Sequence, residues 1–379
     1  MRDPPSAMTL TQRLPASLTS LDAALAALLR GLAPLAVIEL PLKEALGCVT
    51  AETSPLKAYP PSDVAAADGW ALRARDLVGA SSYTPLPLTK SALWVEAGDR
   101  MPNGCDCVID ADAVDQTGPI IQMLTEAIPG QGVRRMGGDF ADGFVVAPGS
   151  RFRPLDILAA RAAELEKIKV RRPRLHVVNV PASTGEVATA QLIQESARSA
   201  GAEVVFAEAA SRDVAAVAEA LDAASCDLLV TIGGSGVGRT DATVAALAQR
   251  GEVIAHGIAL RPGRTSAIGR IGKAPVIAVP GSADDALAAW WTLALPALDR
   301  LSGRQFRRTA VLPLARKIAS TVGIAEIALL GRKDDSWVPL ALGDLPLETI
   351  VSAHAWLMVP GSSEGFAAGT PVAAYMLGE

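Results

Sequence analysis

DLLVTIGGSGVGRTD, residues 227–241, is the stretch of sequence that decides the fold. Its apolar start is rich in Leu, Val and Ile and predicts a buried strand. Four glycines and two hydroxyl side chains follow, and Asp241 is expected to cap a helix over residues 241–250. Such a loop lets backbone N–H groups approach an anion, and the helix N-terminus adds positive charge. A tight turn that merely closes a strand–helix unit has the same pattern, so both interpretations stay open.

The glycine loop differs from the two common phosphate-binding patterns. No lysine follows its glycines, so it is not a P-loop. Gly234, Gly236 and Gly238 are spaced by two, which does not fit G-x-G-x-x-G. A nucleotide-dependent dehydrogenase is therefore excluded.

Composition narrows the class of protein. A chain of 379 residues is expected to form two to four domains. Half of the residues are hydrophobic and 4% are aromatic, so the core is built from Ala, Val, Leu and Ile, as suits α/β layers. The formal net charge of -5 argues against a partner made of nucleic acid, because nucleic-acid-binding proteins usually carry a basic excess.

The cysteines and histidines do not predict a metal site. Cys105 and Cys107 form a C-x-C pair without a second pair, and the three histidines are far apart in sequence. We expect the four cysteines to serve as small buried hydrophobic residues. No secretory leader opens the chain and no apolar run reaches membrane-spanning length, which predicts a cytoplasmic protein without a membrane partner.

Strand and helix alternate through the middle of the chain. The alternation predicts an α/β domain over residues 173–305, with a doubly wound, mostly parallel sheet that binds ligands at the carboxyl ends of its strands. The expected strands are residues 175–180, 203–206, 227–232 and 275–279, and the expected helices are 189–200, 213–223, 243–249 and 283–301.

The flanking sequence predicts three further domains. A helical linker domain combines residues 1–50 with 150–172, an inserted β-rich domain spans 51–149, and a small C-terminal β-barrel or sandwich spans 306–379. Linker helices are expected at residues 18–32 (capped by Ser20), 40–49 and 155–166 (capped by Asp156), followed by a solvated basic connector at 167–174. Inserted strands are expected at residues 93–95, 107–110, 120–124 and 144–147, and C-terminal strands at 327–330, 337–342, 355–359 and 371–377.

Several separated motifs together resemble one family. They are LPLKEALG (40–47), PPSDVAAADGWAL (60–72), AGDRMPNGCDCV (97–108), VRRMGGD (133–139), the glycine loop, RPGRT (261–265) and PGSA (280–283). In order and spacing they resemble the molybdopterin molybdenumtransferases, which include the E domain of gephyrin. The resemblance covers most of the chain, from about residue 21 to its end.

The resemblance implies a particular reaction and assembly. Members form L-shaped homodimers of four-domain chains. They insert molybdate into adenylylated molybdopterin with release of AMP, assisted by Mg²⁺, at a site between the α/β domain of one subunit and the inserted domain of the other. Partners implied are a molybdopterin adenylyltransferase or a molybdoenzyme.

The same resemblance assigns candidate site residues. The catalytic candidates are Asp63, Asp139 and Asp241, and the metal candidates are Asp63, Asp241 and Glu186. Each aspartate also has a structural interpretation, as a turn residue for Asp63 and Asp139 and as a helix cap for Asp241. Asp68 and Asp213 are better explained as a turn residue and a helix cap. The cofactor-binding candidates are Gly233, Gly234, Ser235, Gly236, Gly238, Arg261, Arg264, Gly281 and Ser282.

Some polar positions of the family motifs are lost. The family's Asn and Ser are Val64 and Ala65, one acid of a pair is Val187, and the loop hydroxyl is Gly236. The family's Thr at 97 and Asn-Pro at 282–283 are Ala and Ser-Ala. A pocket that exchanges polar groups for methyl groups binds a charged ligand less well. Two hypotheses follow: a molybdenumtransferase-like enzyme, or a paralogue that binds molybdopterin or a partner protein as scaffold or carrier.

Overall fold

The protein is an α/β chain with several separate sheets. Its structure is a computed structural model, which describes residues 12–52, 55–88, 92–115, 120–144, 146–182, 187–224, 226–305 and 307–377.

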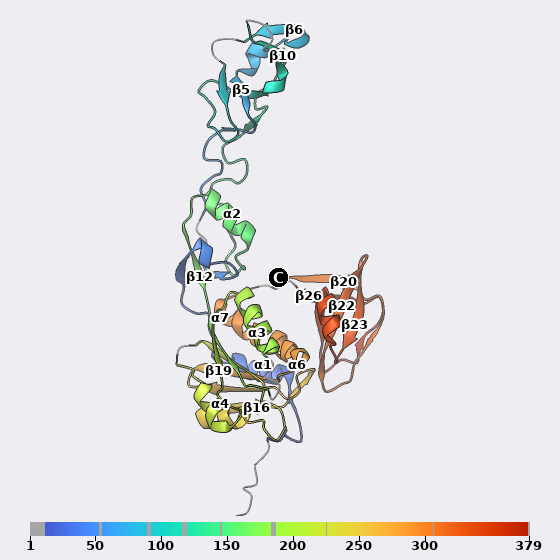
Figure 1. Ribbon diagram of the computed structural model, residues 1–379. Helices are drawn as coiled ribbons and strands as arrows, with labels where there is room; N and C mark the ends of the chain where they lie inside the picture. Colours follow the sequence, from blue (N-terminus) through green and yellow to red (C-terminus); the bar gives the residue numbers. More distant parts are fainter. Residues whose placement is uncertain are drawn as a thin grey trace, which may run out of the picture.

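The chain has an elongated shape in Figure 1. Strand β5 (Gly69–Leu72) and its neighbours lie at one end, helix α2 (Pro154–Ala162) lies in the middle, and the sheet that contains β19 (Ala274–Val279) lies at the other end. Strand β22 (Ala325–Lys333) and the C-terminal strands stand to one side of that sheet. We call the described residues between 55 and 144 the inserted region.

A six-stranded sheet forms the centre of the α/β part. Its first four strands are parallel, whereas β18 runs antiparallel to both of its neighbours. The predicted parallel sheet is therefore confirmed, and the last two strands of the sheet, which are joined through the antiparallel β18, were missed. The order is β14 (Glu203–Glu208), β13 (Arg174–Asn179), β15 (Leu228–Ile232), β19, β18 (Ala267–Ile271) and β16 (Glu252–His256).

Helices cover both faces of this sheet, as the doubly wound prediction required. Successive residues of β15 show the two faces, because Val230 packs into one core cluster and Leu229 into another. Helices α4 (Val214–Ala220) and α5 (Thr243–Arg250) cover the Leu229 side. The Val230 side is covered by α1 (Leu21–Leu29), α3 (Ala188–Ser199), α6 (Ala283–Ala289) and α7 (Leu295–Ser302).

Helix ends differ in part from the prediction. Ser20 caps α1, since its Oγ accepts a hydrogen bond from the Ala23 N–H at 3.3 Å. Asp156 is the third helical residue of α2 and not its cap, because the helix begins at Pro154 after Arg153. The predicted long helix 283–301 is present but contains a π-helical segment, Trp290–Ala294, between α6 and α7.

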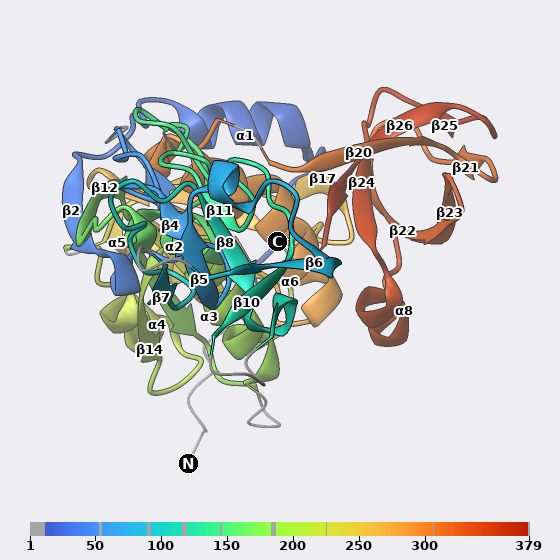
Figure 2. The same ribbon diagram turned by 90° about the horizontal axis from the view of Figure 1, so that it is seen from above.

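The C-terminal strands form a larger sheet than expected. It runs β1 (Thr19–Ser20), β17 (Ile258–Arg261), β22, β24 (Ala355–Val359), β26 (Pro371–Met376) and β20 (Thr309–Pro313), with β23 (Ser336–Leu342) beside β22. A bridge between Leu314 and Trp337 brings the end after β20 against β23, so these strands curl toward a small barrel, as Figure 2 shows. The sheet continues through β17 into the α/β part of the chain.

Two predictions for the linker are wrong. Residues 40–49 form no single helix: β2 (Ile38–Pro41) and β3 (Val49–Thr50) flank a short 3₁₀ turn, Leu42–Glu44. The basic stretch after residue 167 is no solvated connector, because β12 (Lys167–Arg171) pairs with both strands. Ile168 and Val170 alternate with its lysines and are buried, which explains the strand.

The inserted region consists of small sheets. Strands 93–95 and 107–110 are found as predicted, and the third, β10 (Gln122–Thr125), is shifted by two residues at its start. The strand predicted at 144–147 is wrong, because among its described residues Phe144 makes just an isolated bridge to Leu56. The sheets are β5–β7 (Leu93–Val95)–β8 (Cys107–Asp110), β6 (Ser81–Pro87)–β10–β9 (Val114–Asp115) and β4 (Val64–Ala65)–β11 (Val133–Arg134).

Candidate functional site

A cleft with both polar and apolar lining residues lies at the carboxyl ends of three parallel strands. It has a volume of about 360 Å³ and is bordered by the glycine loop after β15, the loop Pro280–Ser282 after β19, and the end of β13. The location is the one that the strand order predicted for a ligand. The lining residues are Asn179, Val180, Ala182, Thr189, Ala190, Arg212, Ile232, Gly233, Gly234, Gly236, Asp241, Thr265, Pro280, Gly281 and Ser282.

Asp241 is not the cap of α5, which corrects the prediction. The helix begins at Thr243, and the carboxylate of Asp241 turns back onto the loop. Its Oδ2 accepts a hydrogen bond from the Gly238 N–H at 2.8 Å. Thr243 fastens the start of the loop, because its Oγ1 donates to the Gly233 carbonyl oxygen at 2.8 Å.

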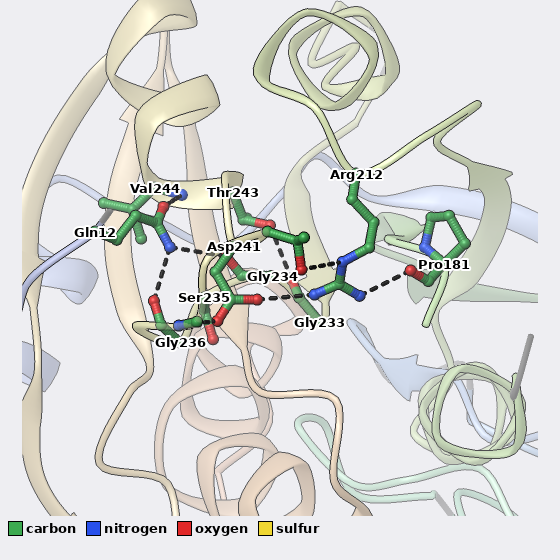
Figure 3. A network of polar contacts seen from close by, with 12 residues as sticks. Gln12, Pro181, Arg212, Gly233, Gly234, Ser235, Gly236, Asp241, Thr243 and Val244 are labelled. Atoms are coloured by element: carbon green, nitrogen blue, oxygen red, sulfur yellow. Dashed lines mark hydrogen bonds and ion pairs between the residues drawn. The ribbon is translucent and has the colours of Figure 1, made fainter. Parts of the chain in front are cut away.

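Among the described lining residues Arg212 is the cation of the cleft, and sequence reasoning missed it. Its Nη2 lies 2.8 Å from Asp241 Oδ1, and its Nη1 donates to the Pro181 carbonyl oxygen at 2.8 Å. Figure 3 shows this guanidinium facing the glycine loop. The sequence held one signal for Arg212, its position directly before Asp213, the residue predicted to cap α4. Asp213 does cap this helix, because its Oδ1 accepts a hydrogen bond from the Ala216 N–H at 3.0 Å.

The absence of a side chain at Gly236 leaves room for the carboxylate of Asp241. A Cβ atom on Gly236 would lie 2.5 Å from Asp241 Oδ2, which is too close for a carbon–oxygen contact. A side chain at this position would therefore require the Asp241 carboxylate to move. The glycine at position 236 thus accommodates the Asp241 carboxylate where it turns back onto the loop.

Buried polar atoms in and beside the cleft lack partners. The Asn179 side chain is 3% exposed and lines the cleft, and its Nδ2 has no hydrogen-bond partner among the described residues. Ser235 is fully buried, and its Oγ is likewise without a partner in the part of the chain that is described. Since a buried unpaired donor is unfavourable, a polar ligand in the cleft would stabilise the Asn179 amide.

The two predicted arginines do not line the cleft. Arg261 forms an ion pair with Glu326 of β22, a carboxylate that is 1% exposed. Arg264 is exposed, and its side chain has no hydrogen bond or ion pair with any residue that the structure describes. Gly281 and Ser282 do line the cleft, and the Ser282 hydroxyl donates to Asp285 Oδ2 at 2.5 Å.

Asp63 and Asp139 lie away from the cleft, in the inserted region. Asp63 accepts a hydrogen bond from the Met136 N–H at 2.8 Å and also contacts Arg135 Nη1 at 3.3 Å. Asp139 pairs with Arg134. Figure 1 places the inserted region at the end of the chain opposite β19, so one chain does not bring these aspartates to Asp241.

The remaining candidates give no metal centre in one chain. Glu186 lies outside the described residues. Within the described ranges, no group of three or more His, Cys, Asp or Glu side chains is placed to hold a metal ion. Asp68 accepts a hydrogen bond from the Ala97 N–H at 2.7 Å, in keeping with its structural interpretation.

The cysteines are thiols in largely buried surroundings. Cys48 and Cys107 are buried, and Cys105 and Cys226 are partly buried. Burial raises the pKa of all four thiols, and raises the pKa of Cys107 and of Cys226 to about 11. Across the described ranges, every helix is too short or too polar to span a membrane.

Comparisons with known proteins agree with this architecture. Residues 19–163 match the MoeA N-terminal region (domain I and II), and residues 167–300 match a family described as a probable molybdopterin binding domain. Molybdopterin molybdenumtransferase 2 of Mycobacterium tuberculosis is 29% identical over 309 residues, which is 70% of this chain and 75% of the relative. The molybdopterin molybdenumtransferase of Synechococcus elongatus is 27% identical over 89% of this chain and 94% of its own length.

Solved structures give the same result. The molybdopterin biosynthesis MoeA protein of Pyrococcus horikoshii superimposes with a TM-score of 0.63 at 25% identity, covering 95% of this chain and 99% of that one. A second structure of a MoeA protein from this organism has a TM-score of 0.67 at 24% identity and supports the fold. Taken together, the two matched regions, the curated relatives and the superposition establish that the chain belongs to the MoeA family of molybdopterin molybdenumtransferases.

Proposed function

We propose that this chain is an enzyme of molybdenum-cofactor biosynthesis that inserts molybdate into adenylylated molybdopterin and releases AMP. The observation that carries the proposal is the cleft at the carboxyl ends of β13, β15 and β19, with an unpaired amide and an arginine in its lining. Adenylylated molybdopterin carries phosphates, which need such donors. Membership of the MoeA family supports the same reaction.

The cleft residues have distinct roles in this proposal. The N–H groups of the glycine loop and the Asn179 amide donate hydrogen bonds to phosphate oxygens. Arg212 offsets the negative charge that grows on the departing AMP phosphate. Since Arg212 is paired with Asp241 before substrate binds, Asp241 holds the guanidinium in position through the 2.8 Å contact.

Magnesium is a separate part of the proposal. Mg²⁺ is usually held by one or two carboxylates together with substrate phosphates and water. In the described part of the cleft the lining carboxylate is Asp241, and both of its oxygens are engaged, by Arg212 and by the Gly238 N–H. These residues do not fit a preformed magnesium site. Activity with and without a chelator tests the requirement.

A homodimer would complete the site. We propose that a second copy of the chain supplies Asp63 and Asp139 from its inserted region to the cleft of the first. The four-domain division, with limits near residues 50, 150, 173 and 306, belongs to this proposal. The proposal also includes a cytoplasmic location and, as a partner protein, a molybdopterin adenylyltransferase or a molybdoenzyme.

The decisive experiment measures AMP. Purified protein is incubated with adenylylated molybdopterin, molybdate and Mg²⁺, and AMP is quantified by chromatography. The wild-type chain should release AMP. Asp63→Asn should abolish release while retaining an oxygen that accepts from the Met136 N–H. Asp112→Asn is the matched control, because Asp112 is exposed in the same region and makes no described contact. Pterin binding without AMP release by the wild type would refute the enzyme and favour the scaffold or carrier.

A further inference from the structure

Gln12, near the beginning of the described chain, contacts the glycine loop with one end of its side-chain amide and helix α5 with the other. Its Nε2 donates to the carbonyl oxygens of Gly234 at 3.0 Å and of Gly236 at 2.8 Å. Its Oε1 accepts from the N–H groups of Val244 at 2.7 Å and of Ala245 at 3.2 Å. One side chain therefore joins the loop to the first turn of α5 across more than 220 residues of sequence.

We propose that Gln12 is a positioning residue for substrate binding, which acts by orienting the backbone N–H groups of the glycine loop. This inference rests on the proposed function, because it concerns the phosphates of the same substrate. Figure 3 shows Gln12 on the side of the loop opposite Arg212. It therefore contacts the loop without occupying the position of the arginine.

The orientation follows from the planarity of the peptide bond. In a trans peptide the carbonyl of one residue and the N–H of the next point in opposite directions. Gln12 holds the carbonyls of Gly234 and Gly236, and His256 Nε2 lies 2.9 Å from the Ser235 carbonyl oxygen between them. Three successive carbonyls are thus held by side chains, and that of Gly234 also accepts from the Thr243 N–H at 3.0 Å. Holding these carbonyls sets the planes of the peptides that carry the three following N–H groups.

Of the residues that carry those three N–H groups, Gly236 lines the cleft, so its amide is the donor nearest to a ligand there. The amides of Ser235, Gly236 and Val237 make no hydrogen bond with any residue in the described ranges. The N–H groups in the first turn of α5 are not available in the same way, because those of Val244 and Ala245 already donate to Gln12 Oε1. The anion contact is therefore moved from the helix N-terminus to the loop amides.

The chain around Gln12 holds it at this place. The side chains of Leu14 and Leu18 pack closely against Gly257, where an added Cβ would lie 3.0 Å from each. The Thr19 N–H donates to the Gly257 carbonyl oxygen at 3.0 Å. Because Gly257 follows His256, the segment that carries Gln12 and the histidine that holds Ser235 are anchored at one point.

The test compares three variants of the full-length protein. Gln12→Met keeps the length of the side chain and removes all four hydrogen bonds. Gln12→Glu keeps the acceptor for α5 and removes the donor to the loop. Arg13→Ala is the matched control, since Arg13 is the exposed neighbour with no contact among the described residues. KM and kcat for AMP release, Kd for adenylylated molybdopterin without molybdate, and Tm are measured for each.

The expected pattern separates positioning from simple capping. Gln12→Met should raise KM and Kd by about tenfold to thirtyfold, as the loss of two neutral hydrogen bonds to the loop would give. Gln12→Glu keeps the bonds to α5 but sets a carboxylate oxygen against two loop carbonyls, so its Tm should lie above that of Gln12→Met while KM and Kd stay raised. If Gln12→Glu restores KM and Kd together with Tm, Gln12 is merely a helix cap and the proposal is wrong.

Failure of the proposed function gives a different result. If the wild type binds the pterin nucleotide without releasing AMP, a higher Kd for Gln12→Met still supports the role of Gln12. If the wild type releases AMP and Gln12→Met has the wild-type KM and Kd, the role of Gln12 is overturned and the function stands. Hydrogen exchange over residues 233–245 gives a ligand-independent measurement, and unchanged exchange in Gln12→Met would also overturn the proposal.

Discussion

Arg261 and Arg264 flank one Pro-Gly turn but have different surroundings. Arg261 pairs with the buried Glu326, which also accepts from the Ser320 hydroxyl at 2.5 Å and the Thr321 N–H at 3.2 Å. Arg261→Ala should lower the free energy of unfolding by about 1–3 kcal/mol, because it leaves a buried carboxylate without its cation. Arg264→Ala should leave stability unchanged, because its side chain is exposed. Urea denaturation of both variants measures the difference, and equal stability would contradict the structural role of Arg261.

The thiol of Cys226 should react slowly at neutral pH. Burial raises its pKa to about 11, and the neighbouring carboxylates of Asp227 and Asp222 contribute. Since the thiolate is the reactive form, alkylation should speed up about tenfold for each pH unit until the pH approaches the pKa. Peptide mass spectrometry after iodoacetamide treatment follows this residue between about pH 7 and pH 10. In urea the same thiol should react at the rate of a free cysteine; equally fast labelling of the folded protein at neutral pH would refute the assignment.

At the level of single residues, the sequence located backbone features better than side-chain partners. Gly233, Gly234 and Gly281 line the cleft as predicted, because loops after parallel strands gather at one edge. Arg212 and Gln12 were missed because their partners are 29 and more than 220 residues away. Distant partners also set the directions of two predicted side chains. Arg261 is directed by its ion pair with Glu326, and Asp241 by its ion pair with Arg212.

At the scale of elements, the contact of α3 with the linker depends on a close backbone approach. Gly201, just after α3, has φ +85°, and an added Cβ would overlap the carbonyl oxygen of Gly47. Gly201→Ala should lower the free energy of unfolding by about 2–4 kcal/mol, from the positive φ together with the overlap. Thermal or urea denaturation measures the loss.

Gly31→Ala is the matched control for this prediction. Gly31 also has a positive φ, +76°, but nothing lies within 4 Å of an added Cβ. Its substitution should cost about 1 kcal/mol, from backbone strain alone. If the two variants are equally stable, the approach of Gly201 to Gly47 does not hold α3 against the linker.

Elements with a strong apolar pattern were predicted well. Strand β15 and helix α5 were found within a residue of their ends, since β15 is a largely apolar run buried on both faces and α5 buries an apolar face. Residues 40–49 were misjudged because β2 and β3 are short and are stabilised by pairing with β12, about 120 residues later. Local pattern carries no information about such a distant partner.

At the scale of the whole molecule, one sheet crosses two parts of the chain. Strand β17 of the α/β part pairs in parallel with β22 of the C-terminal part and with β1 near the beginning. The sequence predicted the C-terminal strands but treated them as a separate unit. Pairing between parallel strands that are far apart in sequence leaves no local signal, so this continuity required the structure.

The separation of the candidate acids within one chain makes the paired subunit testable. If Asp63 of one subunit serves the cleft that contains Asp241 of the other, variants at these positions should complement each other. Asp63→Asn and Asp241→Asn homodimers should each release no AMP. A mixed dimer would hold one cleft with both aspartates and one cleft with neither. Random exchange of equal amounts should then restore about one quarter of wild-type activity, because half of the dimers are mixed and half of their clefts are intact.

The two variants are co-expressed with different affinity tags, and mixed dimers are isolated by tandem purification. Sedimentation checks their mass, and AMP release is then measured. Purified mixed dimers should show about half of the wild-type activity for each dimer. The control mixes Asp112→Asn with Asp241→Asn, because Asp112 is exposed in the inserted region and makes no described contact. Its mixed dimers should also reach half activity, and its Asp112→Asn homodimers should be fully active. Inactive Asp63–Asp241 mixed dimers beside active controls would mean that Asp63 and Asp241 do not meet across subunits, and the shared site would be rejected.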